Sequence, residues 1–218
     1  MKKAIFVTAT GTDIGKTTVS ALLMQAGKSA GLAMRYFKPV QTGDCGDCET
    51  VKQLVGLSDE EILPPSYAYP QPISPHFAAA MAGDTIEADK ILERWHQAPS
   101  GYYIIEGAGG LLTPLGNGVL LRDLIKKLNV PILIVASTIV GTINHTLLTI
   151  EAIRLAQIPL LGIVLNGNKT IGLEATFSEY ANVSVIAHVP PLLQVSSTMI
   201  SEVATSVFPK NFFNVNGF

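Results

Sequence analysis

Residues 5–20 read IFVTATGTDIGKTTVS, and this stretch decides the fold. Its apolar start, which ends at Val7, predicts a short buried strand, because the run is too short and too rich in β-branched residues for a helix. Small and turn-forming residues follow up to Gly15, and Lys16 and Thr17 then open a segment with the apolar spacing of a helix. A strand, a glycine-containing loop and a helix in this order form the setting that a phosphate-binding loop requires.

The loop supplies groups that suit a polyphosphate. Backbone N–H groups at the start of the helix, where its dipole is positive, can surround the phosphates. Lys16 is expected to reach the β- and γ-phosphates, and the hydroxyl of Thr17 to ligate Mg²⁺. The usual motif, G-x-x-x-x-G-K-[ST], has its first glycine where this chain has Thr10. The match is therefore partial, and the alternative is an ordinary turn followed by a surface lysine.

Composition limits the classes to which this chain can belong. It has 218 residues, of which 48% are hydrophobic and 15% charged, and a net charge of −2. We expect one folded α/β domain over residues 1–218, with no clear pattern after about residue 207. No segment carries a dense run of Lys and Arg, so we expect no nucleic-acid partner and no anionic membrane surface. The apolar runs are too short for a membrane-spanning helix or a signal peptide, which predicts a cytoplasmic protein.

Two cysteines, Cys45 and Cys48, are separated by two residues. A zinc site would need two further ligands, and the four histidines are scattered. A redox pair would need this motif at a helix start after a strand, in a fold of its own. We therefore expect two ordinary reduced thiols.

Short, continuously apolar segments alternate with helical ones along the chain, which predicts a mainly parallel sheet with helices on both faces. The expected strands are 4–7, 33–40, 102–105, 131–136, 160–165 and 183–189. The expected helices are 15–30, 49–55, one from Pro75 that stops at Gly83, 86–97, 120–128, 144–157, 174–180 and 194–207. Residues 64–75 are expected to be irregular, and Asp84 with Glu87 is expected to cap the helix 86–97.

Ligands of such sheets bind at the carboxyl ends of the strands. The expected strand ends carry the phosphate loop, Lys38, Glu106, the segment 137–141, Asn166 and Pro190. The carboxylate of Glu106 ends a buried strand and is placed to hold Mg²⁺. Gly107 and Gly109 follow it and indicate a close approach of the backbone to a ligand. The alternative for Glu106 is a capping or surface glutamate.

Three other strand ends leave two interpretations each. Lys38 either faces the phosphates or extends to solvent. Asp44 and Asp47 follow it, and either one can be a second Mg²⁺ ligand or a helix cap. The residues from Gly141 to Asn144 precede a long helix, so their N–H groups either bind an anion or only begin the helix. The amide of Asn166 either reads a base edge or sits in a turn.

Six sequence blocks stand out along the chain: VTATGTDIGKTT (7–18), FKPVQTG (37–43), SPH (74–76), IIEGAGGLLTP (104–114), VGTINHTLLT (140–149) and GIVLN (162–166). Together they resemble one family of enzymes, the dethiobiotin synthetases, which are the ATP-dependent carboxylases of biotin synthesis. The resemblance covers nearly the whole chain and implies a phosphate-loop α/β fold, a homodimer and an ATP-dependent cyclo-ligase. It also implies the substrates 7,8-diaminononanoate, CO₂ and ATP, with Mg²⁺ as cofactor.

The resemblance implies a reaction in three steps. One substrate amine captures CO₂ as a carbamate, and a carbamate oxygen then attacks the γ-phosphate of ATP to give a mixed carbamic–phosphoric anhydride. The second amine closes the five-membered ring and expels phosphate. Because carbamate and triphosphate are both anionic, this chemistry suits a dry site with two lysines and a divalent ion.

The resemblance also implies a role for each matching residue. Lys16 and Lys38 are the implied catalytic lysines, and Thr17, Asp47 and Glu106 are the implied Mg²⁺ ligands. Nucleotide contacts are implied for Asp13, Ile14, Gly15, Lys16, Thr17, Thr18, Asp47, Glu106, Gly107, Ala108, Gly109, Asn166, Val189, Pro190 and Pro191. Substrate contacts are implied for Thr12, Lys38 and Thr42, and, for the substrate carboxylate across the dimer interface, for Gly141, Thr142, Ile143 and Asn144.

One position departs from the family, and three other functions compete. The family usually has glycine where this chain has Ala9, and alanine disfavours a positive φ there. A nucleotide-driven dimerising switch of the partition-ATPase type would carry an extra lysine at the position of Gly11. An amide ligase of the cobyrinate-diamide-synthase type would usually need a further glutaminase domain, for which the chain is too short. A catalytically weakened paralogue is the third alternative.

Overall fold

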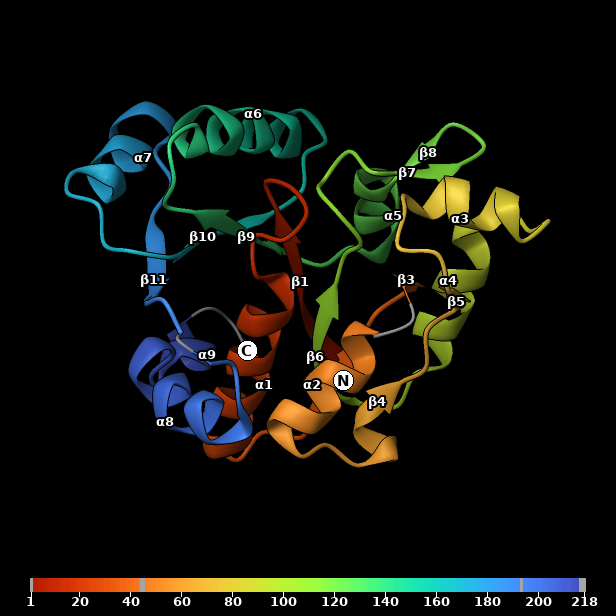
Figure 1. The fold of residues 1–218 in the computed structure, drawn as a ribbon, viewed down its shortest axis with the longest axis horizontal. Helices are drawn as coiled ribbons and strands as arrows, with labels where there is room; N and C mark the ends of the chain where they lie inside the picture. Colours follow the sequence, from red (N-terminus) through yellow and green to blue (C-terminus); the bar gives the residue numbers. More distant parts are fainter. Residues whose placement is uncertain (1, 44–45, 193, 216–218) are drawn as a thin grey trace.

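The strand predicted from the first apolar run is the middle strand of a seven-stranded parallel sheet (Figure 1). The computed structural model describes residues 2–43, 46–192 and 194–215. The strand order is β11-β10-β9-β1-β6-β2-β4, so the chain moves to one side of β1 and then to the other. The strands are β1 (Lys2–Ala9), β2 (Met34–Phe37), β4 (Ile62–Leu63), β6 (Gly101–Glu106), β9 (Ile132–Ser137), β10 (Leu160–Asn166) and β11 (Val185–Val189).

Helices cover both faces of this sheet, as predicted (Figure 1). One face packs against α1 (Lys16–Ser29), α2 (Asp47–Val55), α8 (Ser197–Val207) and α9 (Phe212–Val215). The other face packs against α3 (Pro75–Met81), α4 (Ala88–Gln97), α5 (Leu121–Leu128), α6 (Thr142–Leu155) and α7 (Leu173–Ala181). The buried middle parts of the central strands are almost entirely apolar, as expected for strands with both faces covered.

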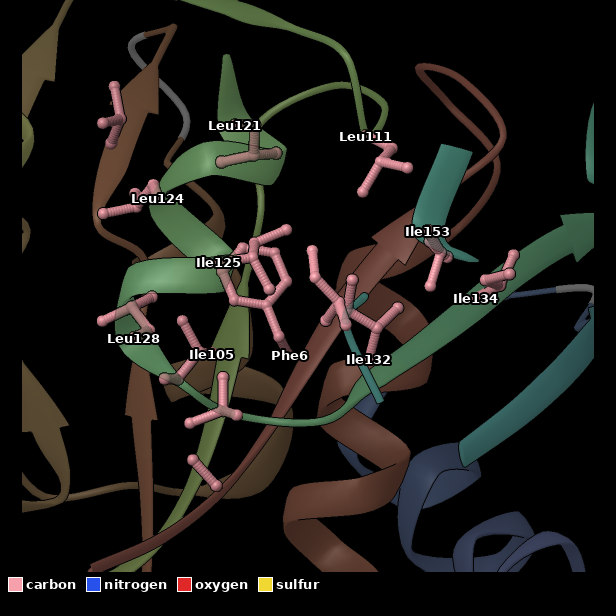
Figure 2. Close-up of a cluster of buried hydrophobic side chains, with 14 of the residues drawn as sticks. Phe6, Ile105, Leu111, Leu121, Leu124, Ile125, Leu128, Ile132, Ile134 and Ile153 are labelled. Carbon is pink, nitrogen blue, oxygen red and sulfur yellow. The ribbon is translucent and has the colours of Figure 1, made fainter. Parts of the chain in front are cut away.

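Side chains alternate between the two faces of a strand, so those of β1 pack alternately into the two core layers. Ile5 and Val7 pack on the side of α1, whereas Phe6 packs on the other side. Figure 2 shows Phe6 surrounded by residues of neighbouring strands and of α5, among them Ile105, Ile125 and Ile132. The strand that leads into the phosphate loop is therefore held from both faces.

The strand expected over residues 33–40 is wrong in one respect, because the chain forms two strands there. β2 ends at Phe37, and β3 (Val40–Thr42) pairs with β5 (Tyr67–Tyr69) in a separate two-stranded sheet. The break falls at Pro39, whose ring nitrogen has no hydrogen to donate to a ladder. The stretch 64–75, which was expected to be irregular, contains β5. The carbonyl of Pro39 accepts a hydrogen bond from the backbone N–H of Ser66, just before β5, and so helps to anchor that strand.

The capping prediction at Asp84 is also wrong. α4 begins at Ala88, and neither Asp84 nor Glu87 caps it with a side chain. The carboxylate of Asp84 instead accepts hydrogen bonds from the hydroxyl of Tyr69 at 2.8 Å and from the backbone N–H of Thr85.

Several short elements were not predicted from the sequence. They are the 3₁₀ turn Asp59–Glu61, β4, the hairpin of β7 (Pro114–Gly116) with β8 (Val119–Leu120), and α9. α6 begins at Thr142, two residues before the expected start. In the parts of the chain that the structure describes, no helix is long and apolar enough to span a membrane.

The prediction of two reduced thiols can be compared with the structure only at Cys48. Cys48 is a free thiol on α2, and burial raises its pKa to about 12, so it stays protonated at neutral pH. Cys45 and Asp44 lie outside the described residues.

Candidate functional site

A cleft of about 690 Å³ opens at the carboxyl ends of β1, β2 and β6. Most residues expected at the site line it, namely Thr12, Asp13, Gly15, Lys16, Thr17, Thr18, Lys38, Thr42, Asp47, Glu106, Ala108 and Gly109. These residues come from four separate segments, and the parallel sheet brings the segments together. The cleft thus lies at the strand ends, where sheets of this kind bind ligands.

The phosphate loop runs from β1 to α1 and is shaped by left-handed backbone at two residues. Gly15 precedes α1 with φ of 95°, and Asp13 has φ of 57°. The Nζ of Lys16 donates a hydrogen bond to the carbonyl of Gly11 at 3.1 Å, which folds the lysine back over the loop. Ala9 is the last residue of β1 and is absent from the residues with positive φ among those described. Its methyl group therefore causes no backbone strain in the loop.

Four polar side chains meet beside the loop. The Nζ of Lys38, at the end of β2, lies 2.9 Å from Oε1 of Glu106 and 2.6 Å from Oδ2 of Asp47. The hydroxyl of Thr17 lies 2.8 Å from Oδ1 of Asp47 and 3.1 Å from Oε1 of Glu106. Lys38 is 3% exposed and Glu106 is fully buried, so these charges interact with little screening by water.

The pKa values in the cluster follow from burial and from these partners. Burial alone would lower the pKa of Lys38, but the carboxylates of Glu106 and Asp47 outweigh it and leave that pKa above its ordinary value. Burial lowers the pKa of Lys16, and the positive charge of Lys38 lowers it further. For Asp47, burial would raise the pKa, but Lys38 and then Thr17 hold it below its ordinary value. At neutral pH the cluster therefore contains the ammonium group of Lys38 beside the ionised carboxylate of Asp47.

The donor set of this cluster fits Mg²⁺. Mg²⁺ prefers oxygen ligands and is usually held by one or two carboxylates together with phosphate oxygens and water. Thr17, Asp47 and Glu106 supply one hydroxyl and two carboxylates whose oxygens converge within 3.1 Å of the Thr17 hydroxyl. Among the described residues, no group of three or more His, Cys, Asp or Glu side chains is arranged to hold a metal without additional ligands such as phosphate oxygens. The site thus suits a metal that arrives with a nucleotide.

Gly107 and Gly109, which follow Glu106, are explained by two different structural requirements. A Cβ on Gly107 would lie 2.9 Å from side-chain atoms of both Phe6 and Leu121, so core packing excludes a side chain there. Its carbonyl accepts a hydrogen bond from Lys38 at 3.1 Å. Gly109 has φ of 67° and lines the cleft. The expected approach of backbone to ligand is therefore possible at Gly109, whereas Gly107 approaches the protein core.

Asn166 lies behind the phosphate loop at the end of β10. Its side-chain Nδ2 donates a hydrogen bond to the carbonyl of Ile14 at 2.9 Å. Asn166 is paired in register with Val189, the last residue of β11, and Pro190 and Pro191 follow that strand on the surface. These residues share one edge of the sheet but do not line the described cleft.

The segment from Gly141 to Asn144 does not line the cleft of its own chain. Gly141 precedes α6 with φ of 95°, and the hydroxyl of Thr142 donates to the carbonyl of Ser137 at 2.6 Å. Gly141, Ile143 and Asn144 are exposed. The start of α6 is therefore accessible to a second molecule at these three residues.

Two groups of residues at the site were not predicted. Residues 72–75 and Thr113 line the cleft, and the SPH block was a signal for the former, although no role was assigned to it. The hydroxyl of Tyr36 donates to Oε2 of Glu106 at 2.9 Å. Burial, followed by the charge of Glu106, raises the pKa of Tyr36 well above its ordinary value, so the phenol keeps its proton. Tyr36 is two residues before Lys38, and side chains two apart on a strand share a face, which was an available signal.

This combination of a parallel sheet, a loop at the end of its middle strand and a lysine at the start of α1 defines a phosphate-loop nucleotide-binding protein. Solved structures agree on the fold. The MinC:MinD cell division protein complex of Aquifex aeolicus matches with a TM-score of 0.64 at 13% identity, over 99% of this chain and 96% of that one. A ParA family ATPase of Chlorobium tepidum matches with a TM-score of 0.59 at 12% identity, over 93% and 98%.

Sequence relatives give the family. The family model described as "AAA domain" matches residues 3–198. The ATP-dependent dethiobiotin synthetase BioD of Rhizorhabdus wittichii is 42% identical, over 97% of this chain and 99% of that protein. The protein of the same name from Rhodopseudomonas palustris is 38% identical, over 97% and 95%. The chain belongs to the dethiobiotin synthetase family.

Proposed function

We propose that this protein is an ATP-dependent dethiobiotin synthetase, a cyclo-ligase that makes dethiobiotin from 7,8-diaminononanoate, CO₂ and ATP. Membership of the family supports the class of enzyme. The observation that carries the proposal is the meeting of Lys38, Asp47 and Glu106 beside the phosphate loop. Such a cluster suits a reaction between two anionic groups.

The reaction joins a carbamate to a phosphoryl group and then releases phosphate. A carbamate, formed from one amine and CO₂, attacks the γ-phosphate of ATP and displaces ADP. The second amine then attacks the carbonyl carbon of the resulting anhydride and displaces phosphate. The substrate supplies both attacking groups, so the protein needs no nucleophile of its own. Its task is to hold two negatively charged reactants in one orientation and to offset their repulsion.

Each lysine is assigned one of the two reactants. Lys16 extends along the phosphate loop and is assigned the β- and γ-phosphates of ATP. Lys38 is assigned the carbamate and the phosphoryl group in transfer, because it is buried at the strand end facing the loop. Thr12 and Thr42 line the same cleft and are assigned the diamine. Thr17, Asp47 and Glu106 would hold Mg²⁺, which when bound supplies positive charge to the phosphate oxygens.

The remaining assignments concern the base and the partner subunit. Asn166 and the turn at Val189, Pro190 and Pro191 are assigned the adenine, since they share the sheet edge next to the phosphate loop. We propose a homodimer in which Gly141 to Asn144 of one copy bind the substrate carboxylate of the other. The exposure of Gly141, Ile143 and Asn144 at the start of α6 supports this arrangement. A cytoplasmic location stays a prediction.

One assay tests the proposed function. The protein is incubated with Mg-ATP and bicarbonate, with and without 7,8-diaminononanoate, while phosphate release and the mass of the product are followed. We expect phosphate release to depend on the diamine and to match the dethiobiotin formed. Phosphate release that ignores the diamine would instead indicate a nucleotide-driven switch.

The role of Lys38 can be tested by Lys38→Ala. We expect turnover to fall by about a thousandfold or more, because the carbamate and the phosphoryl group lose their nearest cation. Nucleotide affinity, measured by calorimetry with Mg-ADP, should change only a few-fold. Lys52→Ala is the control, since Lys52 pairs with Asp59 on the surface, and it should retain normal turnover. Normal turnover in Lys38→Ala would remove this lysine from the reaction.

A further inference from the structure

The phenol of Tyr36 is a buried polar group to which the reaction assigns no task. Tyr36 lies on β2 and is fully buried, with apolar neighbours from α1, α2 and the central strands in the same core layer. Its hydroxyl nevertheless reaches Oε2 of Glu106 at 2.9 Å, across 70 positions of sequence. A hydroxyl in an apolar layer is costly unless it is hydrogen-bonded, so the phenol of Tyr36 depends on the carboxylate of Glu106 as its acceptor.

The two oxygens of Glu106 face different surroundings. Oε1 lies 2.9 Å from Nζ of Lys38 and 3.1 Å from the hydroxyl of Thr17, both of which line the cleft. Oε2 receives the hydrogen bond from Tyr36, on the core side. The carboxylate is thus held between a buried donor behind it and the groups of the cleft in front.

This arrangement fixes a torsion that a glutamate does not fix by itself. The last torsion of a glutamate side chain, between a tetrahedral and a planar carbon, has a broad energy profile. A hydrogen bond to Oε2 selects one orientation of the carboxylate plane, which points Oε1 at the cleft. Outer partners of this kind orient metal ligands, and their loss typically costs 10- to 100-fold in metal affinity or activity.

We propose that Tyr36 is a positioning residue, whose phenol orients the carboxylate of Glu106 so that Oε1 faces the divalent cation that accompanies the nucleotide. The proposal rests on the proposed function for the identity of the reaction, but not for the contact between Tyr36 and Glu106. It differs from a purely structural role, in which the phenol would contribute to folding alone. The two roles make different predictions for metal binding.

The test compares Tyr36→Phe with Tyr103→Phe. Both changes remove one hydroxyl from a fully buried ring and leave the ring in place. The hydroxyl of Tyr103 donates to the carbonyl of Pro99 at 2.8 Å, away from the cleft, so its loss reports the structural effect alone. Mn²⁺ binding is titrated by electron paramagnetic resonance with ADP present, and the Mg²⁺ dependence of synthesis is measured in parallel.

For Tyr36→Phe we expect the dissociation constant of Mn²⁺ to rise about tenfold, together with the Mg²⁺ concentration that gives half-maximal rate. The KM for the diamine should stay within a factor of two, and Tyr103→Phe should match the wild type in metal binding. If Tyr36→Phe lowers the unfolding temperature but binds Mn²⁺ like the wild type, the proposal is overturned. Tyr36→Met, which also fills the space without a hydroxyl, provides a second protein for the same titration should the phenylalanine variant fail to fold.

A double-mutant cycle adds an independent measurement. If Tyr36 acts through Glu106, then Tyr36→Phe should weaken Mn²⁺ binding no further in a Glu106→Gln background. Additive effects would show that Tyr36 acts by another route. The Mn²⁺ titrations do not require synthesis, so a wild-type protein that fails to make dethiobiotin would refute the proposed function and leave the role of Tyr36 testable.

Discussion

Gly15 shows how the phosphate loop depends on one residue without a side chain. It has φ of 95°, and a Cβ there would lie 2.1 Å from Nδ2 of Asn166. Gly15→Ala would therefore strain the backbone and displace the amide that supports the carbonyl of Ile14. We expect the free energy of unfolding to fall by about 1–2 kcal/mol and the affinity for Mg-ADP to fall at least tenfold. Urea unfolding and calorimetry measure the two effects.

Gly31→Ala is the control that separates the effect of backbone strain from the effect of the contact with Asn166. Gly31 follows α1 with φ of 80°, and a Cβ there would meet nothing within 4 Å. This variant should lose a similar amount of stability but bind Mg-ADP like the wild type. A loss of nucleotide affinity in Gly31→Ala, or none in Gly15→Ala, would contradict the assignment of Gly15 to the loop.

At the scale of elements, Asp84 links β5 to the segment 84–87 that precedes α4. The hydrogen bond from Tyr69, followed by that from the backbone of Thr85, holds the pKa of Asp84 below its ordinary value of 3.8. A carboxyl group whose pKa is lower in the folded state stabilises the protein above its unfolded-state pKa. That stabilisation should be lost as the pH falls through the lower, folded-state pKa.

The prediction concerns the difference in free energy of unfolding between the wild type and Asp84→Asn. We expect a measurable difference at about pH 6 that shrinks towards about pH 3, since the protonated carboxyl group then resembles the amide. Denaturant titrations at several pH values provide the measurement, and Tyr69→Phe should reduce the same pH dependence. A difference in free energy of unfolding that does not vary with pH would mean that the ionisation of Asp84 does not contribute to stability.

Asp84 and Tyr36 also show where inference from sequence stops. Six of the seven strands of the main sheet and most helices were predictable, because continuous apolar runs and helical spacing are local patterns. The cleft was predictable too, since parallel strands bring their ends to one edge. The pairing of β3 with β5 and the bonds from Tyr69 to Asp84 and from Tyr36 to Glu106 depend on contacts between distant residues. No local pattern contains that information.

The whole molecule has apolar surface beside its cleft that folding of one chain leaves uncovered. Leu112 is 48% exposed and Leu148 is 57% exposed. Both line a hollow of about 390 Å³ next to the first residues of the phosphate loop, and Thr113 lines both the hollow and the cleft. Exposed apolar side chains gathered in this way indicate an interface. This surface supports the proposed homodimer, in which a second copy would cover it.

Leu148→Asp tests that assembly, because it places a charge where an apolar contact is expected. We expect sedimentation equilibrium to show weaker self-association than in the wild type, by at least tenfold in the dissociation constant of the dimer. The rate of dethiobiotin synthesis should fall with it and recover as protein concentration rises, since Gly141 to Asn144 are assigned to the partner's substrate. Val195→Asp is the control: Val195 is 44% exposed, in the segment before α8 on the opposite face of the sheet, and this variant should associate normally. If Leu148→Asp associates like the wild type, a second copy does not cover this surface.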